Sequence, residues 1–338
     1  MDRDAFYMRR ACRLAERALG NTTPNPIVGA VIVKGGVILG EGFHTKAGNP
    51  HAEVEAIRAA RGRRLKGATL YVTLEPCSTW GRTPPCTEAI IEHGISRVVI
   101  GCTDPNPRHA GAAAGILREH GIEVVSGVEE ERCALLNEAF FKWIQYKKPF
   151  VILKLAMTLD GRIAAESGDS KWVTGPAARK RVQKLRQWAD AVMVGGGTYR
   201  TDSPRLTVRD PHDVDIKVPL RFVASNRKMD LPSGWEQVAL NDALDWDTFL
   251  ADLGKRPVLS LLLEGGGELA ASALNAGAVD KIEFHYAPKI LGGKHSRPGV
   301  GGYDPETLSE AFGIEKMKIE KLGGDFAVTG YVAPRGRV

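Results

Sequence analysis

The chain of 338 residues is 43% hydrophobic and 25% charged, a composition typical of a globular protein and a length too great for one ordinary core. It contains no apolar run of 18 residues and no apolar segment after the N-terminus, so we expect neither a membrane span nor a signal peptide. The formal net charge of +6 is spread along the chain without a basic arm, which favours phosphorylated small molecules over nucleic acid as partners.

The predicted elements of the first half alternate between helices and strands. Apolar residues at helical spacing, such as Met8 and Cys12, predict a first helix, and Gly35-Gly36 predicts a hairpin turn between two strands. Pro84-Pro85 suits the first turn of a later helix. This pattern predicts a layered α/β domain. Its helices are expected at 4–19, 51–61, 84–93, 111–119 and 129–146, and its strands at 27–33, 37–43, 69–74 and 98–100.

A second α/β series follows a break at Pro149, because proline disfavours helix in the residue before it. We therefore predict two domains, 1–146 and 147–338. The polar, aperiodic stretch 203–218 is predicted to be a loop. Strands are expected at 150–157, 191–194, 220–224, 258–263 and 281–286, and helices at 176–187 and 267–275.

The first chemical motif is His51-Ala52-Glu53, followed by Pro76-Cys77 and Pro85-Cys86. One imidazole and two thiolates are three ligands for a tetrahedral Zn²⁺, which leaves the fourth position for a water molecule. Glu53 lies within reach of that water as the general acid and base. The pattern is that of zinc deaminases acting on nucleobase-like rings, although here eight residues separate the two cysteines. The plainer interpretation is a core histidine with two inert thiols.

The cysteine count indicates the cellular compartment. An odd number of widely spaced cysteines, without an export signal, argues against a disulfide framework. A cytoplasmic protein that uses two of them as metal ligands fits better. The five are Cys12, Cys77, Cys86, Cys102 and Cys133.

Three segments of the first half carry a family resemblance: Thr23–Gly29, Leu74–Cys86 and Asp104–Pro107. They resemble the bacterial RibD family of bifunctional riboflavin-biosynthesis enzymes, and the resemblance continues through the second half. It implies a cytidine-deaminase-like three-layer domain followed by a dihydrofolate-reductase-like domain. It also implies two reactions: deamination of 2,5-diamino-6-(5-phosphoribosylamino)pyrimidin-4-one to 5-amino-6-(5-phosphoribosylamino)uracil, and reduction of the ribosyl group to ribityl by NADPH.

By this resemblance Asn25, His44 and Arg82 contact the deaminase substrate. An asparagine amide offers both a donor and an acceptor to a ring edge, and an arginine binds phosphate bidentately. Two positions of the first half depart from the family pattern: Thr79 stands where relatives usually have histidine, and Ala113 stands where they usually have glycine. If position 113 requires a positive φ, Ala113 is strained.

The second half carries five matching segments, and Glu264–Gly267 lies between a predicted strand and a predicted helix. Such a glycine-rich turn suits a phosphate group, although it is more often only a tight turn. The resemblance implies substrate contacts from Ser170, Arg186, Leu206, Arg209 and Glu264. It implies NADPH contacts from Ala156, Trp172, Thr198, Asp202, Ser225, Gly266, Gly267, Glu268, Leu269, Ala270 and Ala271. The other segments are Lys154–Arg162, Ser170–Gly175, Asp190–Thr198 and Asp202–Arg209.

Several alternatives stay open at this point. Either Lys154 or Asp160 assists proton delivery in the reduction, and Ala224 replaces an aspartate that relatives often carry in the cofactor region. The resemblance suggests a homo-oligomer, either a dimer or a tetramer. The alternative function is a zinc deaminase of another nucleobase substrate, such as tRNA, with a non-catalytic second domain.

Overall fold

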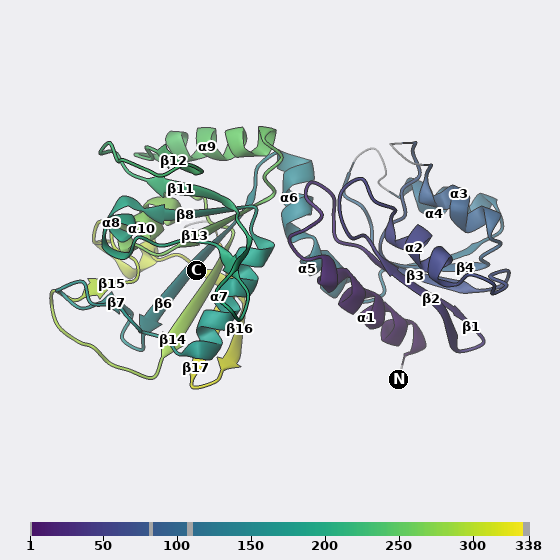
Figure 1. The fold of residues 1–338 in the computed structure, drawn as a ribbon, viewed down its shortest axis with the longest axis horizontal. Coiled ribbons are helices and arrows are strands. Elements are labelled where there is room, and N and C mark those ends of the chain that lie inside the picture. The colour runs from purple at the N-terminus through teal and green to yellow at the C-terminus, as the bar shows by residue number, and fades with distance from the viewer. Residues whose placement is uncertain (1, 81–83, 107–110, 334–338) are drawn as a thin grey trace. The chain divides into compact units, whose positions relative to one another are not determined.

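The computed structural model describes residues 2–80, 84–106 and 111–333. The chain divides into two compact units, Met1–Lys147 and Lys148–Val338, each with its own sheet (Figure 1). Among the residues described, no helix combines the length and the apolar character needed to cross a membrane.

The first unit places helices on both faces of one sheet (Figure 1). The sheet has the order β2-β1-β3-β4-β5, with β1 antiparallel to β2 and β3, and with β3, β4 and β5 parallel. The helices are α1 (Arg3–Ala15), the short 3-10 turn η1 (Glu16–Ala18), α2 (Ala52–Ala59), α3 (Cys86–Glu92), α4 (Ala112–Glu119), α5 (Glu130–Leu136) and α6 (Glu138–Tyr146). The strands are β1 (Gly29–Lys34), β2 (Val37–Phe43), β3 (Thr69–Leu74), β4 (Arg97–Cys102) and β5 (Glu123–Ser126).

Alternating apolar residues of β1 supply both faces of this sheet. Ala30 and Ile32 pack with α2, α3 and α4, whereas Val31 and Val33 pack with α1 and α5. The helix α2 approaches β2 unusually closely, because a Cβ atom on Gly42 would lie 2.4 Å from the backbone nitrogen of Ala56. Glycine at this position therefore lets α2 sit close against the sheet.

The second unit is built on one eight-stranded sheet of order β12-β11-β8-β13-β6-β14-β17-β16. Strands from β12 to β14 are parallel, and β17 and β16 extend the sheet in antiparallel fashion. The strands are β6 (Phe150–Thr158), β8 (Ala191–Gly195), β11 (Leu220–Ala224), β12 (Trp235–Val238), β13 (Ser260–Glu264), β14 (Lys281–Ala287), β16 (Ile314–Leu322) and β17 (Asp325–Val332). Two small sheets pair β7 (Arg162–Ala164) with β15 (Arg297–Pro298) and β9 (Val208–Arg209) with β10 (Asp215–Lys217).

The two faces of this sheet differ in character. One face carries the main apolar core, which includes Leu153, Leu263 and Ile282 and is closed by α9 (Ala243–Lys255) and α10 (Gly267–Asn275). The opposite face carries α7 (Pro176–Trp188), whose arginines reach Glu264 and Glu283 on the sheet. The remaining helical segments are α8 (Gly196–Asp202) and the 3-10 turn η2 (Leu308–Glu310).

The structure differs from the sequence predictions at several points. The single helix expected over 129–146 is two helices, α5 and α6, which break at Asn137. The loop expected over 203–218 contains the short β9–β10 hairpin. The elements that were not predicted include the helix α9 and the strands β16 and β17. The strand β16 is exposed along almost its whole length, and a register shift between Glu315 and Lys318 interrupts the alternation of its side chains.

Candidate active sites

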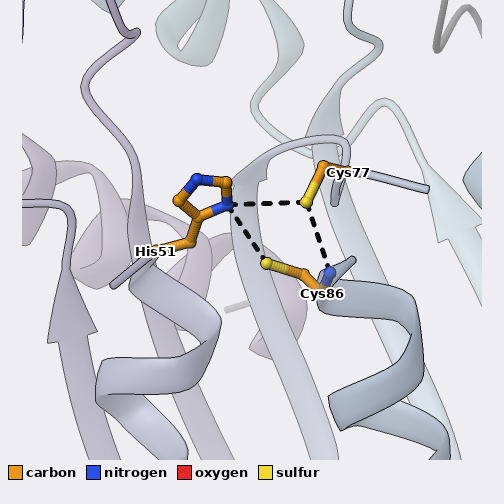
Figure 2. Close-up of side chains that lie close together, drawn as sticks. All are labelled: His51, Cys77 and Cys86. Atoms are coloured by element: carbon orange, nitrogen blue, oxygen red, sulfur yellow. Dashed lines mark hydrogen bonds between the residues drawn. The ribbon is translucent and has the colours of Figure 1, made fainter. Parts of the chain in front are cut away.

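Three side chains converge at one end of α2 and α3 (Figure 2). His51 is the residue immediately before α2, Cys77 follows β3, and Cys86 begins α3. The Nδ1 atom of His51 lies 3.3 Å from the Sγ atom of Cys86 and 3.5 Å from the Sγ atom of Cys77. All three ligand atoms lie within 4.8 Å of one another.

These positions fit a tetrahedral zinc ion. Zn–S bonds of about 2.3 Å and Zn–N bonds of about 2.0 Å place tetrahedral ligand atoms roughly 3.5 Å apart. The Cys86 backbone N–H also donates to the Cys77 sulfur at 3.2 Å. Hydrogen bonds from Cys86 and His51 lower the pKa of the Cys77 thiol, which favours the thiolate form that a metal binds. The described residues supply three such ligands, so one coordination position remains for water.

Glu53 stands on the first turn of α2, two residues after His51. Its side chain is 3% exposed, and burial raises the pKa of its carboxyl group. Glu53 is outside the group of metal-ligating side chains, although Cys86 contributes a hydrogen bond to it. A buried carboxyl group next to a three-ligand metal site is suited to moving protons there.

Asn25 and His44 lie beside the metal ligands. The Asn25 side-chain nitrogen is 3.0 Å from Nε2 of His44, and Nδ1 of His44 is 3.1 Å from the Pro50 carbonyl oxygen. The His44 ring meets the His51 ring edge to face, with centroids 5.4 Å apart. Burial lowers the pKa of His44, so its neutral ring accepts from Asn25 and donates to Pro50. Arg82, the third expected substrate contact, lies outside the described residues.

Two residues that sequence reasoning missed hold the loops around this site. Glu75 is buried and accepts backbone N–H groups from Asp104 at 3.3 Å, Gly111 at 3.0 Å and Ala113 at 3.1 Å. Asn137 accepts from the backbone nitrogen of Ile27 and donates to its oxygen, both at 2.9 Å. Glu75 precedes Cys77 by two residues, and that position in the motif was the only available signal for it.

The two departures from the family pattern in the first unit have different outcomes. Ala113 lies inside α4, where its backbone is helical, while Gly111 takes the left-handed conformation with φ of 87°. Position 113 therefore does not require a positive φ, and Ala113 is not strained there. Thr79 is exposed, and its neighbour Trp80 donates from its indole nitrogen to Glu88 at 3.1 Å.

The second unit contains a cavity of about 2060 Å³ at the carboxyl ends of the parallel strands β6, β8, β11 and β13. This edge of a parallel sheet is where α/β proteins bind ligands. Eleven lysines and arginines but only four acidic residues line the cavity. Such a charge balance fits ligands that carry several phosphate groups.

The cavity gathers most of the predicted reductase residues. Two predicted cofactor contacts do not line this cavity: Ala270 lies in the hydrophobic core, and Ala271 lines a smaller neighbouring cavity. A Cβ atom on Gly267 would lie 2.7 Å from the Pro298 oxygen, so only glycine fits there. The lining includes Ala156, Ser170, Trp172, Arg186, Thr198, Asp202, Leu206, Arg209, Ser225, Glu264, Gly266, Gly267, Glu268 and Leu269.

Arg186 and Glu264 form the most buried ion pair of the cavity wall. The guanidinium group donates from Nε at 2.6 Å and from Nη2 at 2.8 Å, and Nη1 reaches the Thr207 oxygen at 3.2 Å. The two side chains are 11% and 9% exposed. Two other predicted contacts also lie in this wall. The Asp202 Oδ1 atom is 3.5 Å from Nζ of Lys171, and Leu206 is buried with a positive φ of 55°. The bonds between Arg186 and Glu264 therefore hold one guanidinium group and one carboxylate in defined positions in the cavity wall.

Lys154 and Asp160, the two candidates for proton delivery, differ sharply. Lys154 lines the cavity, and burial lowers the pKa of its ammonium group. Asp160 is exposed and is not among the residues that line the cavity. Its carboxylate accepts from the Thr158 hydroxyl at 2.6 Å and from the backbone nitrogens of Leu291 and Gly292 at 3.1 and 2.7 Å, which lowers its pKa to about 2. This geometry favours Lys154.

Two family models match the chain. Residues 1–102 match the cytidine and deoxycytidylate deaminase zinc-binding region, and residues 149–328 match the RibD C-terminal domain. These matches confirm the predicted α/β fold class of both domains. They also support both predicted cofactors, Zn²⁺ and NADPH, together with the His51, Cys77 and Cys86 group.

Relatives match over almost the whole chain. The riboflavin biosynthesis protein RibD of Synechocystis is 44% identical over 97% of this chain and 96% of its own, and that of Escherichia coli is 38% identical over 95% and 97%. The structure of Acinetobacter baumannii RibD covers 98% of this chain and 99% of its own at 37% identity, with a TM-score of 0.86.

A crystal structure from Thermotoga maritima gives the same picture. It is described as a diaminohydroxyphosphoribosylaminopyrimidine deaminase/5-amino-6-(5-phosphoribosylamino)uracil reductase, is 38% identical over 98% of this chain and 99% of its own, and has a TM-score of 0.86. Full-length matches of this kind do not favour a tRNA deaminase with an inactive second domain. The chain belongs to the RibD family of bifunctional deaminase-reductases of riboflavin biosynthesis.

Proposed function

We propose that residues 1–146 deaminate 2,5-diamino-6-(5-phosphoribosylamino)pyrimidin-4-one and that residues 147–338 reduce the deaminated product with NADPH. The observation that carries this proposal is the pairing of two sites in one chain. One is a three-ligand metal site with a buried acid, and the other is a large cationic cavity at a parallel-sheet edge.

In the deaminase we assign His51, Cys77 and Cys86 as the metal ligands. A bound zinc ion supplies an activated water to the carbon that carries the 2-amino group. Glu53 then takes a proton from the attacking water and delivers it to the departing nitrogen, so that ammonia leaves and a carbonyl group forms. Asn25 orients the pyrimidine edge, and its bond to His44 at 3.0 Å fixes the direction of its amide. Arg82 is assigned to the substrate phosphate.

In the reductase the cavity holds both reactants, and the cofactor supplies hydride to the opened sugar carbon. We assign Arg186 and Arg209 to the substrate, because guanidinium groups match phosphate oxygens. We assign Gly266 and Gly267, which line the cavity at the start of α10, to the cofactor phosphates, because glycine lets backbone N–H groups approach a phosphate closely. Lys154 faces the cavity, where it delivers a proton to the oxygen of the reduced carbon. The other predicted contacts that line the cavity keep the ligands that the family resemblance implies. For the substrate these are Ser170, Leu206 and Glu264, and for NADPH they are Ala156, Trp172, Thr198, Asp202, Ser225, Glu268 and Leu269.

We also propose a cytoplasmic homo-oligomer that acts on small molecules. All five cysteines are free, which suits a reducing compartment. The edge strand β16 leaves Met317 and Ile319 exposed, and a second copy of the chain covering this edge would bury them. Ligand binding centred on the cavity requires no nucleic-acid partner.

The test is to supply the zinc-loaded protein with the diaminopyrimidine substrate, with and without NADPH. Without NADPH we expect ammonia and the deaminated ribosylaminouracil to accumulate. With NADPH we expect the ribityl product and one NADPH consumed per molecule. Deamination without NADPH oxidation would contradict the reductase assignment. Salt-sensitive RNA binding with deamination of tRNA would contradict the substrate assignment.

A further inference from the structure

Lys154 stands in a row of charged residues that crosses the sheet. In the strand register Lys154 on β6 is paired with Glu264 on β13 at one side and with Glu283 on β14 at the other. Registered residues of neighbouring strands project from the same face, here the face opposite the apolar core. Lys154 therefore has one carboxylate on each neighbouring strand.

Each of these carboxylates is held by an arginine of α7. Arg186 holds Glu264, as described above. Arg181, five positions earlier, donates to the Glu283 carboxylate from Nε at 2.7 Å and from Nη2 at 3.2 Å. The helix thus fixes both carboxylates that flank Lys154, and it does so with the same fork-like geometry.

Glu283 differs from Glu264 in one respect that matters: it does not line the cavity. It is 3% exposed, and its Oε1 atom also lies 3.0 Å from Nε2 of His285, which is fully buried. These bonds hold the pKa of Glu283 down at about 2, so the group is an anion that accepts from both partners. A buried ion pair of this kind is often replaceable by apolar side chains without loss of stability, so stability alone does not account for it.

We propose that Glu283 is a positioning residue of the reductase, which acts together with Glu264 to keep Lys154 charged and fixed beside the cavity. The inference rests on the proposed role of Lys154 as the proton donor. Burial disfavours the ammonium form of Lys154, and Arg186 disfavours it further, whereas Glu264 and Glu283 favour it. The other charged or titratable groups packed here are Arg181, His285, Arg209 beside Glu264, and Glu320, which is 3.8 Å from Arg181.

The experiment compares pH profiles of reductase kcat at saturating deaminated substrate and NADPH. Deuterated NADPH is used as well, to establish that hydride transfer limits the rate. Glu283→Gln removes an anion beside Lys154, so we expect the alkaline limb to move down by about one pH unit or more. Arg181→Met removes a cation behind Glu283, so we expect the limb to move up. Glu320→Gln, which removes an exposed carboxylate beside the same arginine, is the matched control and should leave the profile unchanged.

Opposite shifts from the two variants, with restoration of the limb in Glu283→Asp, would support the proposal. Superimposed profiles, or shifts in the same direction, would overturn it. Glu283→Gln fails to fold if the reductase activity is lost while deamination stays intact. In that case Arg181→Met alone decides: an upward shift of its alkaline limb supports the proposal, and the absence of that shift overturns it. A Lys154→Met protein with a normal reductase rate would instead refute the proton-donor role, and the inference with it.

Discussion

The two units place their reactive groups in contrasting ways. In the first unit every metal ligand and the buried acid fall between His51 and Cys86, on the ends of three neighbouring elements. In the second unit the cavity takes its lining from Lys154 to Gly301. A short motif is therefore sufficient to specify the deaminase chemistry, whereas the reductase depends on how an entire sheet and its helices assemble.

The two sites also differ in how they treat buried acids. Glu53 has no lysine or arginine partner within the described ranges, and burial raises its pKa. Glu264 and Glu283 are each clamped by an arginine of α7. An acid left without a cation is available for proton transfer, while a clamped acid contributes fixed charge. Substitution of Glu53 should therefore affect activity alone, and substitution of the arginines that hold Glu264 and Glu283 should affect stability as well.

The largest expected effect is that of Glu53→Gln. The glutamine keeps the size of the side chain but cannot carry the proton, so deamination should fall by about 10²–10⁴-fold or more. Zinc content, measured on the purified protein, should stay at one ion per chain, and NADPH oxidation with added deaminated substrate should be normal. A variant that deaminates at the wild-type rate would disprove the assignment of Glu53.

Arg186→Met should lower both activity and stability. It removes the guanidinium group that pairs with the buried Glu264 and leaves only Lys154 and Arg209 as neighbouring cations, and breaking a buried pair typically costs about 3–5 kcal/mol in the free energy of unfolding. Reductase activity should be lost, while deamination persists. The matched control is Arg256→Met, which breaks the more exposed pair with Glu236 and should cost about 1 kcal/mol or less. Denaturant unfolding of both variants checks the difference; equal losses would show that burial of the pair is unimportant.

The sequence predicts the compact deaminase site better than the reductase cavity, whose residues are dispersed along the chain. The zinc ligands and Glu53 are recognisable because a metal site restricts residue types at fixed short spacings. Most strands and helices follow from their apolar periodicity. The break at Asn137 was not predicted; the Asn137 side chain there bonds to the backbone of Ile27, 110 positions earlier in the chain, and such a long-range contact has no local sequence signal.

Long-range pairing explains the other missed features. Glu75 organises the loop at Gly111 and Ala113 through backbone groups that carry no residue signature. In the sequence Glu283 is only a polar residue within a predicted strand, and the strand register is what places it beside Lys154. The strand β16 pairs with β17 although its side chains are exposed, and a register shift between Glu315 and Lys318 interrupts its alternation, so its sequence alone does not predict a strand.

The acid stability of the second unit should depend on Glu283. Its pKa falls from 4.5 to about 2 on folding, so its ionisation stabilises the folded state above pH 4.5, and this contribution is lost as the pH falls towards 2. The loss amounts to roughly 3 kcal/mol. Thermal unfolding of the wild type should therefore weaken over this interval more steeply than that of Glu283→Gln. Parallel pH dependence in the two proteins would contradict the buried, ionised state of Glu283.

The smallest effect is expected from Asp160→Asn, and it separates the two candidates for proton delivery. A carboxyl group with a pKa of about 2 carries no proton to donate at neutral pH. Its visible task is to accept from Leu291 and Gly292, and asparagine retains one acceptor oxygen for that purpose. We expect Asp160→Asn to keep a reductase kcat near that of the wild type, while Lys154→Met loses about 10²-fold or more. Steady-state NADPH oxidation measures both; a fall of that size in Asp160→Asn would transfer the proton-donor role away from Lys154.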